Sequence, residues 1–154
     1  RRGELLWDIG AGSGSIGIEW MLADTSLQAI AVEADGERAA RIGRNATAFG
    51  VPDLRIVHGK APEALGGLEA PHAIFIGGGG SDPGLLDAAM AALRSGGRLV
   101  ANAVTLEMEA LLLARHASHG GDMVHLAVSR AAPIGAMTGW RPAMPVVQWR
   151  WSKP

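Results

Sequence analysis

The chain has 154 residues, 48% of them apolar, which is enough for one domain with a single hydrophobic core. Its 14 basic residues nearly balance its 15 acidic residues, and the net charge of -1 excludes the strongly basic surface typical of proteins that bind nucleic acid. Without cysteine the chain has no disulfides or thiolate metal sites, and no apolar run approaches the roughly 18 residues that cross a membrane. We therefore expect a cytoplasmic protein that binds neither nucleic acid nor membranes.

Short apolar runs alternate with helical patterns along most of the chain. They predict strands at 4–9, 28–33, 54–58, 72–76 and 98–104, and helices at 15–23, after Asp35, at 82–94 and at 105–119. Two last strands, 123–130 and 145–151, are separated only by a loop with Pro133, Gly135, Gly139 and Pro142, so they should pair antiparallel. The pattern predicts an α/β fold: five βα units forming a mostly parallel, seven-stranded sheet with a C-terminal antiparallel hairpin and helices on both faces.

Glycine is the compositional outlier, and its densest cluster follows the first expected strand. The chain has 22 glycines, about double the average share of roughly 7%. Gly10, Gly12, Gly14 and Gly17 form overlapping G-x-G-x-G and G-x-G-x-x-G patterns directly after Asp8. A carboxylate at this place would repel the pyrophosphate of a dinucleotide, whereas the sulfonium and ammonium groups of S-adenosylmethionine suit it.

Glu33 ends the second expected strand, where an acid can accept hydrogen bonds from both hydroxyls of a ribose. Enzymes that bind NAD share this feature. Glu33 therefore indicates an adenosine ligand without choosing between the two cofactors.

These residues together resemble the class I S-adenosylmethionine-dependent methyltransferases, and the resemblance covers nearly the whole chain. Asp8-x-Gly10-x-Gly12-x-Gly14 looks like their first motif, Glu33 like their ribose acid, and residues 93–99 like the turn into their fifth strand. The resemblance implies a Rossmann-like fold in which the glycine turn lies beneath the methionine moiety and residues 59–61 line the adenine. It implies cofactor-binding roles for Asp8, Gly10, Ala11, Gly12, Ser13, Gly14, Glu33, Lys60 and Ala61.

Three further segments, 58–65, 73–78 and 99–107, resemble one subgroup, the decarboxylating precorrin-6Y C5,C15-methyltransferases of cobalamin biosynthesis. The similarity is to their C15-methylating, decarboxylating domain. It implies methylation of a precorrin at C15 with loss of an acetate carboxyl group, a homotetramer, and an N-terminal tetrapyrrole methylase domain in the fused forms. We expect a single domain that is a fragment of such a bifunctional protein, because the chain begins without Met. The family's helical segment before the first strand is absent, so we also expect reduced cofactor affinity.

The segment after the fourth expected strand argues against methylation of DNA or RNA bases. Amino methyltransferases of nucleic acids resemble [Asp or Asn]-Pro-Pro-[aromatic] there, whereas this chain has Gly77 to Gly80. Four glycines let a large flat ligand approach the backbone and offer amides to an anion. A merely flexible loop is the alternative.

No acidic residue follows Asp122, so Arg130 and Arg141 lie in a basic stretch that suits the carboxylates of a precorrin. A solvent-facing basic strand is the alternative. Trp140, in the expected loop, would cover the macrocycle or lie in a subunit interface. The candidate substrate-binding residues are Gly77, Gly78, Gly79, Gly80, Arg130, Trp140 and Arg141.

For catalysis, positioning of the acceptor carbon matters more than a strong base, so we expect no nucleophile. Asn102 and Thr105 are candidates to orient the substrate, although Asn102 is equally suited to cap the next helix. His116 and His119 lack acidic partners nearby, so we expect no metal site. Two rival functions stay open: a methyltransferase of another small molecule, and a non-catalytic module that binds the cofactor.

Overall fold

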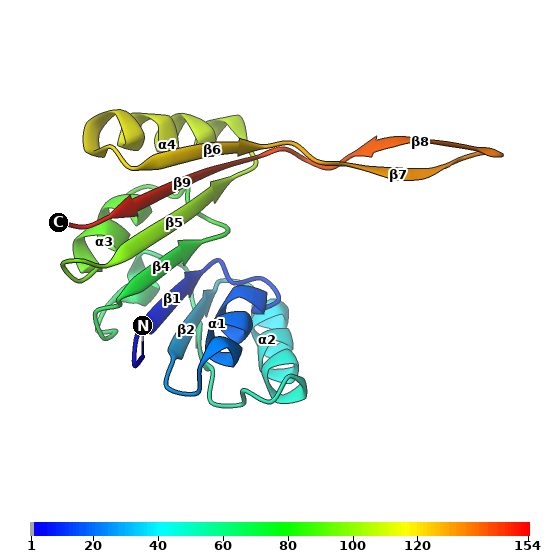
Figure 1. Ribbon diagram of the computed structural model, residues 1–154. Coiled ribbons are helices and arrows are strands. Elements are labelled where there is room, and N and C mark those ends of the chain that lie inside the picture. Colours follow the sequence, from blue (N-terminus) through cyan, green and yellow to red (C-terminus); the bar gives the residue numbers. More distant parts are fainter. Residues whose placement is uncertain (1) are drawn as a thin grey trace.

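The structure is a computed structural model that describes residues 2–154. Its main sheet consists of β1 (Leu5–Ile9), β2 (Gln28–Glu33), β3 (Arg55–His58), β4 (Ala73–Ile76), β5 (Arg98–Ala103), β6 (Asp122–Leu126) and β9 (Val146–Ser152). The strand order is β3-β2-β1-β4-β5-β9-β6 (Figure 1). The strand β9 pairs antiparallel with both of its neighbours, β5 and β6, whereas the other pairs in the main sheet are parallel. The expected seven-stranded, mostly parallel sheet is therefore confirmed, including its last antiparallel pair.

Helices cover both faces of this sheet, as the sequence predicts. They are α1 (Ser15–Ala23), α2 (Gly36–Ala48), α3 (Leu85–Ala92) and α4 (Leu106–His119), with a short 3-10 helix, η1 (Glu63–Leu65). Ile18 of α1 and Ile42 of α2 pack against one face, around Ala31. Leu85 of α3 and Leu112 of α4 pack against the other, around Ile74. The crossover from β3 to β4 contains only η1, so the third of the five expected βα units lacks a full helix.

Helix ends follow local side-chain chemistry. The carboxylate of Asp35 accepts a hydrogen bond from the N–H of Arg38 (2.8 Å) and caps α2. Thr105 caps α4 by accepting from the N–H of Met108 (3.3 Å). Asn102, the alternative cap, instead accepts from the side-chain amide of Gln148 (2.9 Å) on β9.

The expectation that a helix begins at Asp82 is wrong. Gly84 precedes the first helical residue and has a φ of 78°, a left-handed conformation that glycine adopts without strain. The helix α3 therefore begins only at Leu85 and ends at Ala92. Asp82 is left in the loop after β4, which frees its carboxylate for another partner.

The segment expected as a loop between the last two strands is instead a second, two-stranded sheet. Strands β7 (Ser129–Ile134) and β8 (Met137–Pro142) pair antiparallel across a two-residue turn, in which Gly135 has a φ of 59°. The glycines and prolines of this segment suggested a loop. In a two-stranded ribbon, however, each strand pairs with its partner on one side only, and the other side needs no hydrogen-bond donors. Its open side tolerates a proline nitrogen that has no N–H to donate.

This ribbon, which we call the arm (residues 129–142), projects away from the main sheet beyond the end of β5 (Figure 1). Trp140 therefore lies in a strand and not in a loop, and it is 75% exposed. Ile134 and Met137 at the tip are also exposed. Arg130 and Arg141 are direct partners across the two strands. Within residues 2–154, no helix is long and apolar enough to span a membrane.

Candidate functional site

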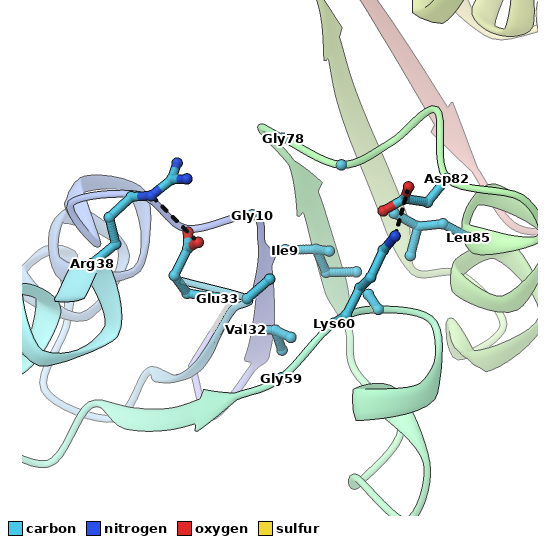
Figure 2. A pocket seen from close by; sticks show the side chains of 13 residues that line it. Ile9, Gly10, Val32, Glu33, Arg38, Gly59, Lys60, Gly78, Asp82 and Leu85 are labelled. Carbon is cyan, nitrogen blue, oxygen red and sulfur yellow. Dashed lines mark ion pairs between the residues drawn. The ribbon is translucent and has the colours of Figure 1, made fainter. Parts of the chain in front are cut away.

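The loops that follow β1, β2, β3 and β4 meet at the carboxyl edge of the sheet and enclose a cleft (Figure 2). The cleft contains about 560 Å³ of empty space, including the open solvent at its mouth. Its lining residues are Ile9, Gly10, Val32, Glu33, Ala34, Arg38, Gly59, Lys60, Ala61, Gly78, Gly79, Asp82 and Leu85. Ligands of parallel α/β sheets bind at this edge, near the point where the strand order reverses.

A close approach of two backbones forms one wall of the cleft. Gly10 has a φ of 68°, and a Cβ built on it would lie only 2.6 Å from the backbone nitrogen of Gly78. No side chain fits at residue 10 while the loop after β4 keeps this position. The glycine turn and the loop that begins at Gly77 therefore form one continuous surface.

The carboxylate of Glu33 is held by backbone donors at the opposite wall. One oxygen accepts from the N–H of Gly12 (2.8 Å), and the other accepts from the N–H of Asp35 (3.0 Å). The Nε of Arg38 lies 3.7 Å from the second oxygen. Glu33 is only 5% exposed, yet it lines the cleft, so its remaining lone pairs are available to a ligand.

Most N–H groups of the glycine turn already have acceptors within the protein. Gly10 and Ala11 donate to the carbonyl of Val32, and Gly12 donates to Glu33. Further along, Gly14 donates to the carbonyl of Ala11, and Gly17 donates to the carboxylate of Asp8 (3.0 Å). A dinucleotide pyrophosphate relies on such donors. This turn therefore fits a cationic ligand better than a phosphate.

Asp8 lies beneath the turn and is 1% exposed. Burial raises the pKa of Asp8 to about 6, the hydrogen bond from Gly17 opposes this rise, and the charge of Glu33 adds to it. With that pKa, Asp8 is mainly ionised at neutral pH. The acidic pair Asp8 and Glu33 gives this end of the cleft the negative charge that the sequence predicts.

Four of the nine predicted cofactor residues line the cleft directly: Gly10, Glu33, Lys60 and Ala61. The others shape the turn behind it. Ala11 is buried against α2, and Ser13 is exposed, with its carbonyl accepting from the side chain of Asn45 (2.9 Å). A Cβ on Gly14 would lie 2.7 Å from Ile42, so glycine lets α2 pack close to the turn.

Two charged lining residues were not found by sequence reasoning. Arg38 lies one turn into α2, and its only sequence signal is its spacing from the cap Asp35. Asp82 was expected to begin a helix, but it lies in the loop before α3, and its Oδ1 is 3.2 Å from the Nζ of Lys60 across the cleft (Figure 2). The cleft thus contains two acid–base pairs, Glu33 with Arg38 and Asp82 with Lys60, and the sequence predicted neither pair.

The candidate substrate residues divide into two groups. Gly78 and Gly79 line the cleft, whereas Gly77 contacts Phe75 and Gly80 is buried beside Met108. The second group, Arg130, Trp140 and Arg141, lies on the arm and does not line the cleft. Asn102 and Thr105 are also outside its lining. Among residues 2–154, no three His, Asp or Glu side chains come together as metal ligands.

The parallel sheet with its antiparallel β9 and the acidic glycine-turn cleft define a Rossmann-like methyltransferase domain. The family model described as "Precorrin methyltransferase domain" matches residues 1–153, and the chain belongs to this family.

Relatives with known names support the assignment. The chain is 67% identical over 153 residues to the precorrin-6Y C(5,15)-methyltransferase [decarboxylating] of Sinorhizobium sp, covering 99% of this chain and 37% of the relative. It is 37% identical over 150 residues to the cobalt-precorrin-6B C(15)-methyltransferase (decarboxylating) of Salmonella typhimurium. That match covers 94% of this chain and 77% of the relative. The crystal structure of the C-terminal domain of precorrin-6Y C5,15-methyltransferase from Rhodobacter capsulatus superposes with a TM-score of 0.92 at 47% identity, covering 99% of this chain and 82% of that one.

The buried carboxyl group of Asp8 should give the folding stability a pH dependence. The folded protein binds the Asp8 proton more tightly than the unfolded chain, so the free energy of unfolding falls as pH rises from about 4 to about 6. Asp8→Asn removes this fall in the free energy of unfolding, because asparagine has no carboxyl group to titrate. The quantity to compare is the free energy of unfolding of the variant minus that of the wild type. We expect this difference to be about 2 kcal/mol larger at pH ~7.5 than at pH ~4.5. Urea unfolding at both pH values measures this difference, and a pH-independent difference would contradict the raised pKa.

Proposed function

We propose that this domain transfers a methyl group from S-adenosylmethionine to C15 of a precorrin and promotes loss of the carboxyl group of an acetate side chain. The observation that carries the proposal is the glycine turn with Glu33, in which most backbone donors are satisfied within the protein and the carboxylate of Glu33 lines the cleft. Membership of the precorrin methyltransferase domain family supports the substrate class. The chain spans about 37% of the length of its bifunctional relative, so the activity of the whole protein is part of the proposal.

For the cofactor, we assign the ribose hydroxyls to Glu33 and the adenine to the apolar part of the cleft between Val32, Ala61 and Leu85. The turn from Gly10 to Gly14 would face the methionine portion, and Asp8, buried beneath the turn, would attract its positive charges without touching them. When bound, S-adenosylmethionine supplies an electrophilic methyl group. The residues of the chain hold it and exclude phosphate-bearing competitors.

For the substrate, we propose that the loop from Gly77 to Gly80 forms the floor and that the arginines of the arm bind peripheral carboxylates. An electron-rich ring carbon forms the new bond to the methyl group, and S-adenosylhomocysteine leaves with the electron pair of the broken S–C bond. In the second reaction the C–C bond to the acetate carboxyl breaks, CO2 leaves, and the electron pair passes into the conjugated ring before a proton replaces it. A protonated ring imine supplies this electron sink, so no protein nucleophile is needed.

Asn102 and Thr105 stay candidates to orient the substrate, each with one group already engaged. The Oδ1 of Asn102 is fixed by Gln148, which leaves its amide N–H groups as donors. The hydroxyl of Thr105 accepts from Met108, which leaves its proton to donate. Both residues would therefore act on substrate as hydrogen-bond donors, which suits carboxylates.

For its partners, we propose that the domain follows a tetrapyrrole methylase domain in the full-length protein and assembles as a homotetramer. The fraction of the bifunctional relative that it covers supports the first part. The arm supports the second, because Ile134, Met137 and Trp140 are 66%, 79% and 75% exposed on a ribbon that projects from the body. Apolar surface of this kind typically marks an interaction site.

Removal of the Glu33 carboxylate should weaken cofactor binding. We expect Glu33→Ala to lower the affinity for S-adenosylhomocysteine at least about 10-fold, because a hydrogen bond to a charged group contributes roughly 1.5–3 kcal/mol. Glu37→Ala, at an exposed residue outside the cleft, is the matched control. Isothermal titration calorimetry measures the affinity of both variants and of the wild type for S-adenosylhomocysteine. Tighter binding of NAD than of S-adenosylmethionine to the wild type would refute the assigned cofactor.

The proposed reaction changes substrate mass in two recognisable steps. Incubation with S-adenosylmethionine and the C5-methylated precorrin should give a product that has gained one methyl group and lost one CO2, as measured by mass spectrometry. A product methylated on a different kind of acceptor would favour another small-molecule methyltransferase. Cofactor binding without turnover of any acceptor would favour a non-catalytic module.

A charge at the tip of the arm should break the assembly and leave the cleft intact. We expect Met137→Asp to lower the particle mass measured by light scattering, with unchanged affinity for S-adenosylhomocysteine. Phe49→Asp provides the control, since Phe49 is similarly exposed (61%) but lies at the end of α2 on the body. A wild-type monomer, or a tetramer that tolerates the arm variant, would contradict the proposed role of the arm.

A further inference from the structure

The ion pair between Lys60 and Asp82 has no role in the proposed function so far. Lys60 belongs to the loop after β3, and Asp82 belongs to the loop after β4. Their side chains point toward each other across the cleft, with the Nζ of Lys60 3.2 Å from the Oδ1 of Asp82 (Figure 2). Both residues line the cleft that contains Glu33.

The backbone holds Asp82 at a fixed place. Its N–H donates to the carbonyl of Gly79 (2.9 Å), and its carbonyl accepts from the N–H of Leu85 (3.2 Å). Gly79 has a φ of 68°, and a Cβ built there would lie 3.5 Å from the Oδ2 of Asp82. The turn thus sets the position of the carboxylate, and the Lys60 ammonium holds it from the opposite side.

The contribution of this pair to stability is small. Lys60 and Asp82 have side-chain exposures of 66% and 31%, and ion pairs that are this accessible to solvent typically contribute about 0–1 kcal/mol. The two loops are also anchored separately by backbone hydrogen bonds, such as the one from the N–H of Ala64 to the carbonyl of Lys60 (2.9 Å). Its place inside the cleft points to a role in ligand recognition.

The surroundings of Asp82 suit one edge of a purine. Val32, Ala61 and Leu85 offer apolar surface for a flat ring in the same cleft, and Glu33 is the acid assigned to the ribose. An ionised carboxylate only accepts hydrogen bonds. The exocyclic group of adenine is an amine that donates, whereas hypoxanthine has an oxygen there that accepts and would be repelled.

We propose that Asp82 recognises the exocyclic amine of the cofactor's adenine ring and that Lys60 is a positioning residue for the Asp82 carboxylate. This inference rests on the proposed function, because it takes an S-adenosyl compound as the ligand of the cleft. It adds a determinant of base specificity on a loop that is otherwise assigned to the substrate. The cofactor and substrate sides of the cleft then share the loop after β4.

The test compares two ligands that differ only in the exocyclic group, S-adenosylhomocysteine and S-inosylhomocysteine. Isothermal titration calorimetry gives the affinity ratio for the purified protein without any need for turnover. We expect the wild type to bind the adenosyl ligand at least about 10-fold more tightly than the inosyl ligand. This is the gain in affinity expected from one hydrogen bond to a charged group. Asp82→Asn should lower this ratio to near one, and Lys60→Met should lower it partly.

Two control variants separate base recognition from general damage. Glu33→Ala should weaken both ligands alike and leave the ratio unchanged, because it acts at the ribose. Asp87→Asn removes an exposed α3 carboxylate that pairs with Arg115 outside the cleft, and it should change neither affinity. The thermal midpoint of Asp82→Asn should stay at the wild-type value, which shows that a changed ratio does not come from unfolding.

The outcomes distinguish this inference from the proposed function. If the wild type binds S-adenosylhomocysteine and Asp82→Asn keeps the wild-type ratio, Asp82 does not read the base and only this inference is overturned. If Lys60→Met keeps the wild-type ratio while Asp82→Asn loses it, the positioning role of Lys60 is overturned. If the wild type binds neither ligand, the proposed cofactor is wrong, and this inference is overturned with it.

Discussion

The two hydrogen bonds that backbone N–H groups donate to the carboxylate of Glu33 connect the parts on which the cleft depends. One donor, Gly12, belongs to the turn after β1, and the other, Asp35, begins the loop into α2. Through these two bonds a single buried side chain fixes both loops, and they hold its carboxylate in one orientation at the edge of the cleft. A carboxylate so held needs no rearrangement when it accepts ligand hydroxyls, and this reduces the entropy lost on binding.

A steric constraint at Gly10 extends this arrangement to the other side of the cleft. Its backbone approaches Gly78 so closely that no Cβ fits between them, and this contact brings the loop after β4 beside the turn after β1. The same loop carries Asp82, whose carboxylate meets Lys60 from the loop after β3. Four loops at one edge of the sheet are thus connected by one acid, one glycine contact and one ion pair. The chemistry of the cleft follows from how these loops are spaced.

Local sequence predicted the sheet, most helices and the Glu33 side of the cleft, because their signals act over a few residues. Strand hydrophobicity, the Asp35 cap and the glycine turn after Asp8 are of this kind. Asp82 and the arm were misinterpreted because their structure depends on distant partners. The Asp82 carboxylate pairs with Lys60, which lies in the preceding loop, on the other side of β4 in the sequence. Gly84 has a φ of 78°, so α3 begins only after it, at Leu85. The arm forms because residues 129–134 and 137–142 pair in register, which outweighs the turn preferences of their glycines and prolines.

The basic residues that follow Asp122 divide into two pairs with different surroundings. Arg150 pairs with Asp122 beside it, and Lys153 donates to the carbonyls of Met90 and Ala91 near the end of α3, so both complete the body of the fold. Arg130 and Arg141 instead lie directly opposite each other on the arm, and neither forms an ion pair within residues 2–154. Like charges in directly opposed positions destabilise a ribbon, so this pair costs folding stability on its own. An anionic partner offsets that cost, and a ligand with several carboxylates offers two such partners at once.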